Sequence, residues 1–145
     1  MMTPKRLAGE LQRRLDGPHS DEHTAATADL AAEAIRLLNY ATGSHSPAGM
    51  EFPSTAYLIA ADLSSGAHRM VQLFDQLDNW LEREDAAGML ATDDGTPTTD
   101  VVAAACGHLA VAAWTAQEMS AHLSALQNGI AGLNGRGPNR EGRAA

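Results

Sequence analysis

The sequence predicts an all-α protein, a three- or four-helix antiparallel bundle dominated by one long helical hairpin. Apolar residues recur at three- and four-residue steps along two long segments, and turn-forming residues separate these segments. No segment alternates apolar and polar residues as a half-buried strand would. Aromatic residues make up 4% of the chain while alanine occurs 28 times, so we expect closely spaced helices with small side chains between them.

The first long helix is expected to begin after Ser20 and to continue to Tyr40. Ser20 is a favourable N-cap, and Asp21 and Glu22 follow it in the first turn, where the helix dipole favours negative charge. Its apolar stripe consists of Leu30, Ala34, Leu37 and Ala41. A shorter charged helix, over residues 4–15, is expected within a mobile N-terminal segment of residues 1–19.

The two helices of the hairpin carry the strongest pattern, a heptad repeat of apolar residues. One begins at Ser54, directly after Pro53, and weakens near Glu84; the other is expected to be capped by Thr98 or Thr99. The contact positions expected on the first are Ala60, Leu63, Ala67, Met70, Phe74, Leu77 and Leu81. Those expected on the second are Val102, Ala105, Leu109, Ala112, Ala116, Met119, Leu123, Leu126, Ile130 and Leu133.

The bundle domain is expected to span residues 20–133, followed by a disordered tail of residues 134–145. A turn centred near residue 93 pairs positions of the hairpin whose numbers sum to about 187. This register places Trp80 opposite Gly107, and Gly66 at the level of Ala121. We therefore expect Gly107 to make room for the Trp80 indole, and Gly66 to allow the two backbones to approach closely.

Charge is segregated along the chain. Residues 17–135 hold fifteen acidic and three basic residues, a net charge of −12, whereas residues 1–16 and 136–145 each carry a net charge of +2. An acidic body repels phosphate backbones, so the folded part is not expected to bind nucleic acid. The basic ends leave a weaker alternative, a nucleic-acid-associated regulator.

The remaining composition points to a cytoplasmic protein. The charged N-terminal residues do not provide the apolar core of a secretory signal, and a single cysteine cannot form an internal disulfide. The longest uncharged stretch within an expected helix, residues 101–117, is short for a membrane span and includes a histidine and a glutamine. We expect it to be a buried helix, with no membrane segment.

Reactive side chains gather between Cys106 and His122. His108 and His122 lie fourteen residues apart, about 21 Å along a helix, so they cannot hold one ion together. On a helix His108 points away from Cys106, which is therefore expected to be buried and inert. The sequence offers no pair of nucleophile and base and no phosphate-binding loop, so we expect neither enzymatic activity nor a cofactor. The weak candidates for a metal site are His68, Asp62 and His122.

The candidate interaction residues are Val111, Trp114 and Trp80. Residues 101–116 are apolar on all sides, whereas a helix of a simple bundle keeps one polar face. Val111 and Trp114 lie away from the expected contact positions and need cover. Either the helix expected up to Tyr40 and the linker around Phe52 and Tyr57 cover them, or another molecule does, and the sequence leaves both open.

The stretch FPSTAYLIAADLSSGAHRMVQLFDQLDNWLERE, residues 52–84, resembles a pattern of small uncharacterised helical proteins of high-GC actinobacteria. The shared features are a proline-capped helix and its Gln-Leu…Trp-Leu-Glu-Arg end. This resemblance implies no particular activity. The expected hairpin is also similar in shape to small secreted hairpins with a Trp-x-Gly turn, but the turn ATDDGTPTT lacks that motif.

Together these features favour a non-enzymatic helical interaction or scaffold module that binds a protein partner or a second copy of itself. The alternative is a small-molecule or metal-binding bundle with a site between helices, built from His68, Asp62 or His122.

Overall fold

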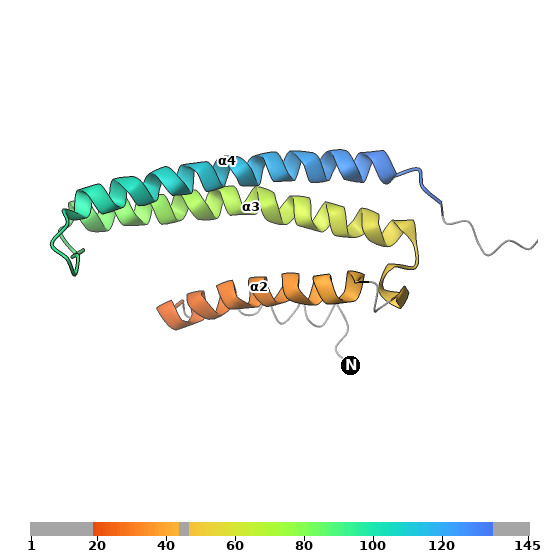
Figure 1. The fold of residues 1–145 in the computed structure, drawn as a ribbon, viewed down its shortest axis with the longest axis horizontal. Coiled ribbons are helices and arrows are strands. Elements are labelled where there is room, and N and C mark those ends of the chain that lie inside the picture. Colours follow the sequence, from red (N-terminus) through yellow and green to blue (C-terminus); the bar gives the residue numbers. More distant parts are fainter. Residues whose placement is uncertain (1–18, 44–46, 135–145) are drawn as a thin grey trace, which may run out of the picture. The chain divides into compact units, whose positions relative to one another are not determined.

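The computed structural model describes residues 19–43 and 47–134, and every regular element within these ranges is helical (Figure 1). The elements are α2 (Asp21–Thr42), the short 3-10 helix η1 (Pro47–Met50), α3 (Pro53–Ala86) and α4 (Thr98–Ile130). This confirms the all-α class. The helix expected over residues 4–15 and the tail expected after Asn134 lie outside the described residues.

The chain divides into two units, Met1–Gly49 with α2 and Met50–Ala145 with α3 and α4. In the first unit, α2 has the expected start: the Ser20 hydroxyl accepts a hydrogen bond from the backbone N–H of His23 at 3.1 Å. None of the residues of α2 is buried. Its apolar stripe is therefore exposed, with Leu37 at 53%.

In the second unit, α3 and α4 lie side by side as an antiparallel hairpin about 50 Å long (Figure 1). The Ser64 hydroxyl reaches the Ser120 carbonyl at 2.9 Å and the Ser124 hydroxyl at 2.8 Å. The residue numbers sum to 184 for Ser64 with Ser120 and to 188 for Ser64 with Ser124, on either side of the expected sum of about 187. The predicted pairing register is therefore confirmed.

The line along which the two helices touch differs from the expected one at alternate positions. On α3 the most buried residues are Ala60, Ser64 and Ala67. Toward the turn, half-buried residues continue the same spacing: Val71, Phe74, Asp78 and Leu81. The expected contact residues Met70 and Leu77 are instead 39% and 43% exposed. At every second position of α3, the observed contact residue therefore lies one residue after the predicted one.

The same displacement occurs on α4. Its contact line runs Val102, Cys106, Leu109, Ala113, Ala116, Ser120, Leu123, Gln127 and Ile130. Met119 and Leu126, expected in that line, are 45% and 51% exposed. Small side chains in both contact lines, such as Ala60, Ser64, Ala67 and Ala116, let the backbones approach closely, and Met70, Leu77, Met119 and Leu126 stay outside these lines.

Reciprocal hydrogen bonds join the helices where these small residues meet. The Ser64 hydroxyl donates to the Ser120 carbonyl, and the Ser120 hydroxyl donates to the Ser64 carbonyl at 3.0 Å. Ser64 is only 7% exposed, and its hydroxyl oxygen can accept a hydrogen bond from the Ser124 hydroxyl at 2.8 Å. We call Ser64, Ser120 and Ser124 the serine clasp.

The ends of α4 also differ from expectation. Its N-cap is Pro97, with no side-chain hydrogen bond, so the expected caps Thr98 and Thr99 are wrong. Pro97 has φ −54° and ψ 129°, and this extended conformation places both threonines inside the first turn. The helix ends at Ile130, short of the expected Leu133.

Gly107 and Gly66 do not have the packing roles expected for them. A Cβ atom on either glycine would meet nothing within 4 Å. Because Cys106 rather than Gly107 lies in the contact line, the Trp80 indole does not fill the space at Gly107. Trp80 is 46% exposed.

Gly107→Ala is therefore expected to stabilise the hairpin by about 1 kcal/mol, since alanine is the better helix former and its methyl group has room. Thermal unfolding followed by circular dichroism measures the gain. Gly95→Ala is the opposing control, because Gly95 has φ +78° and a side chain is strained there. A lower melting temperature for Gly107→Ala would contradict the open environment of this glycine.

Among the described helices, α4 alone is long and apolar enough to span a membrane, judged by length and composition. The expectation that residues 101–117 form a buried helix is wrong for the described chain, because Val102 and Ala116 are the buried residues of α4. The rest of this apolar stretch is exposed or half-buried.

Candidate interaction surface

The displaced contact line leaves a second apolar row on α3, again with alternating four- and three-residue steps. It consists of Ile59, Leu63, Gly66, Met70, Leu73, Leu77 and Trp80. Leu73 is 49% exposed and Trp80 46%, so large apolar side chains face solvent along much of the helix. A repeat with this spacing forms a continuous stripe suited to contact with another helix. We call this row the second seam of α3.

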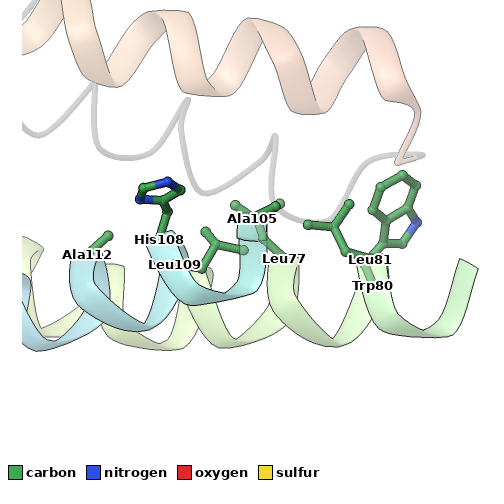
Figure 2. A pocket seen from close by; sticks show the side chains of 7 residues that line it. All are labelled: Leu77, Trp80, Leu81, Ala105, His108, Leu109 and Ala112. Carbon is green, nitrogen blue, oxygen red and sulfur yellow. The ribbon is translucent and has the colours of Figure 1, made fainter. Parts of the chain in front are cut away.

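Side chains of α4 extend the same surface and form an open groove with the second seam. The groove has a volume of about 540 Å³ and is lined by Leu77, Trp80, Leu81, Ala105, His108, Leu109 and Ala112. Figure 2 shows these side chains on the same side of the two helices. Farther along α4, Met119 and Leu126 lie at the same heptad position as Ala105 and Ala112. We call the second seam together with Ala105, His108, Ala112, Met119 and Leu126 the open face.

From Ser65 onward the opposite flank of α3 is polar, whereas Leu58 and Ala61 precede this polar part. It presents Ser65, His68, Gln72, Asp75, Asn79 and Glu82 at the corresponding heptad positions. A difference of this kind between the two flanks is expected when one flank faces water and the other needs an apolar partner. The open face is therefore the candidate interaction surface of the hairpin.

The three expected interaction residues lie on different parts of the hairpin. Trp80 belongs to the open face, whereas Val111 and Trp114 line no part of the groove. Trp114 follows Ala105 by nine residues, a rotation of about 180° around α4, and so points away from the open face. Val111 is 62% exposed and Trp114 64%.

The three weak metal candidates are not brought together. His68 lies on the polar flank of α3, His122 lies toward the open face, and Asp62 is on the outer side of α3. Within the described residues, the group of three with ligand atoms close together is instead Asp78, Glu82 and Cys106, which lie within 4.8 Å of one another. The two carboxylates come from α3 and the thiol from α4.

The chemistry of this group follows from its charges. The carboxylate of Asp78 accepts a hydrogen bond from the Cys106 thiol, and with partial burial and the charge of Glu82 this raises the thiol pKa to about 11. At neutral pH the thiol stays protonated and is a poor nucleophile. This agrees with the expected inertness of Cys106, although the residue is half-buried rather than buried.

Sequence reasoning missed the partners of Cys106 and the serine clasp. In both cases the polar residue stands at a contact position where the pattern favours an apolar one. The pairing register, which brings residue 78 to the level of residue 106, was the signal that could have found Asp78.

No protein-family model, curated protein or solved structure matches the chain. A proposal for the function must therefore be argued from the geometry of the hairpin. The resemblance over residues 52–84 stays a prediction.

Proposed function

We propose that the protein is a non-catalytic helical interaction module and that the open face binds an apolar helical surface. The observation that supports this is the second seam, a seven-position heptad row without a charged residue on a helix that already uses another row for α4. Burying such side chains is favourable by roughly 25 cal/mol per Å² of apolar area.

The proposal includes the three- or four-helix bundle expected from the sequence. The buried apolar residues of the described chain are Ala60, Ala67, Val102 and Ala116, none larger than valine. Two helices with so little buried apolar volume gain much from a further helix over the open face. In this arrangement the chain works in the cytoplasm with a protein partner, as its composition suggests.

Single-tryptophan variants test whether the open face is available. Trp114→Phe leaves Trp80 as the only reporter, and we expect acrylamide to quench it readily in dilute protein, as its 46% exposure implies. A Trp80 that is already shielded in the dilute monomer would contradict the proposal, because no free surface would exist.

Binding of the dye 8-anilinonaphthalene-1-sulfonate gives a second measurement on the same dilute protein. We expect Leu73→Glu to reduce the fluorescence gain about twofold or more, because it places a charge in the second seam. Leu58→Glu is the matched control, since Leu58 is 60% exposed on the same helix and lies outside that seam. Equal losses in both variants would count against the open face as the binding surface.

A second candidate surface is the outer side of α4 around Val111 and Trp114, favoured by its two exposed apolar side chains. Trp114→Glu in the dye measurement tests it. An effect of Trp114→Glu without an effect of Leu73→Glu would move the proposed surface to this side.

A further inference from the structure

We propose that the partner of the open face is a second copy of this chain, with α3 packed antiparallel to α3 of the other copy along the second seam. This inference rests on the proposed function and names the occupant of the surface. The grounds are the order of large and small residues in the seam and the charges beside it.

The first ground is the fit between side chains. Antiparallel packing about a two-fold axis near residue 71 pairs Met70 with Leu73 of the second copy, and Gly66 with Leu77. The space beside Gly66 is empty, since a Cβ there would meet nothing within 4 Å. A leucine from the second copy can occupy that space, so the register gives the glycine a packing role that the hairpin itself does not.

The second ground is charge. The residues that border the second seam on its outer side are Asp62, Arg69, Gln76 and Arg83. In the same register, Asp62 lies across from Arg83 of the second copy, and Arg69 lies across from Gln76. The two-fold axis repeats both pairs, so each dimer contains two ion pairs between opposite charges and none between like charges on this border.

Other registers and orientations of the two α3 helices lose this match of side chains and charges. Sliding one helix by a heptad brings Arg69 against Arg69 of the second copy and removes the pairing of Asp62 with Arg83. Parallel packing sets Gly66 against Gly66 and Trp80 against Trp80, which leaves a gap at one level and crowds another. By length and composition, α4 is apolar enough to enter a membrane. A membrane surface, however, has no side chains that could match the large and small residues of the second seam.

Sedimentation equilibrium of the full chain, from micromolar to sub-millimolar concentration, tests the inference. We expect a reversible monomer–dimer equilibrium. Leu73→Glu should raise the dimer dissociation constant at least about a hundredfold, because each dimer would bury two carboxylates in an apolar seam. Leu58→Glu, outside the seam, should leave the constant within about twofold of the unmodified value.

A charge exchange tests the register. Asp62→Arg and Arg83→Asp should each weaken the dimer about three- to tenfold at low salt, and the double variant should recover the original dissociation constant to within about twofold. Recovery in the double variant distinguishes a paired contact from two separate effects on the stability of α3.

A monomer at every concentration whose Trp80 is open to acrylamide would overturn the second copy as the partner and leave the proposed interaction surface standing. A monomer with a shielded Trp80 would overturn both. Binding to phosphatidylcholine vesicles without a dimer in solution would replace the second copy with a membrane surface. A dimer that Leu73→Glu does not weaken would also overturn the inference.

Discussion

Ser64→Leu is expected to destabilise the protein by about 3 kcal/mol. Ser64 is 7% exposed at the point where the small side chains of α3 and α4 meet, so a leucine must push the helices apart. The substitution also removes the hydroxyl that bonds to Ser120 and Ser124, and it leaves the Ser120 carbonyl without that donor. Urea unfolding at a fixed protein concentration measures the loss as a lower midpoint.

Two variants separate overpacking from the lost hydrogen bonds. Ser64→Ala keeps the helices close but removes the hydroxyl, and is expected to cost about 1 kcal/mol. Ser65→Leu makes the leucine substitution one residue along, on the exposed polar flank, and is expected to change stability by less than about 0.5 kcal/mol. Similar losses for the leucine variants at positions 64 and 65 would contradict the observed contact line.

Asp78→Asn is expected to make Cys106 severalfold more reactive toward iodoacetamide at pH 8, up to about tenfold. The thiol pKa is raised from 9.0 to about 11, chiefly by its hydrogen bond to Asp78. Without that carboxylate the thiol pKa falls toward 9.0, and because burial and the charge of Glu82 remain, the thiolate fraction rises by less than about a hundredfold. Because a thiolate of lower pKa is less nucleophilic, the net gain in rate is smaller than the gain in thiolate.

Mass spectrometry of the alkylated protein over time gives this rate. Asp75→Asn is the matched control, since Asp75 lies three residues before Asp78 on the polar flank of α3 and does not contribute to the thiol pKa. Equal rates for Asp78→Asn and the unmodified protein would show that Asp78 does not hold the thiol proton.

The same pKa shift has a consequence for stability at high pH. The folded protein holds the thiol proton up to about pH 11, whereas an unperturbed thiol releases it near pH 9.0. Between these values the unfolded state ionises first, so this contribution to stability is present below about pH 9 and is lost as the pH rises. Cys106→Ser is expected to lack this part of the alkaline destabilisation in parallel unfolding measurements.

Much of the secondary structure was predictable from local sequence. Ser20 caps α2 as expected, and α3 begins at Pro53, one residue before the predicted start at Ser54. The length of the segment between α3 and α4 was enough to predict their pairing register to within a few residues. These features depend on interactions between residues close in the chain, so sequence patterns report them well.

The candidate interaction surface was harder to predict from the sequence than the helices. Exposed Trp80 and Trp114 were singled out together, but the hairpin places them on different surfaces. The open face could not be recognised before the contact line was known, because leucines and methionines at heptad spacing predict a seam without saying which helix they meet.

The sequence alone determined that α3 and α4 are long helices whose apolar residues recur with seven-residue periodicity. The tertiary structure decided which of two adjacent rows joins them. Leu63 and Ser64 both fit the period, and hydrophobicity favours the leucine, but close approach of the backbones favours the serine, which also bonds across to Ser120. This preference depends on residues more than fifty positions apart, and it leaves large apolar side chains of both helices, such as Leu73 and Met119, on the open face.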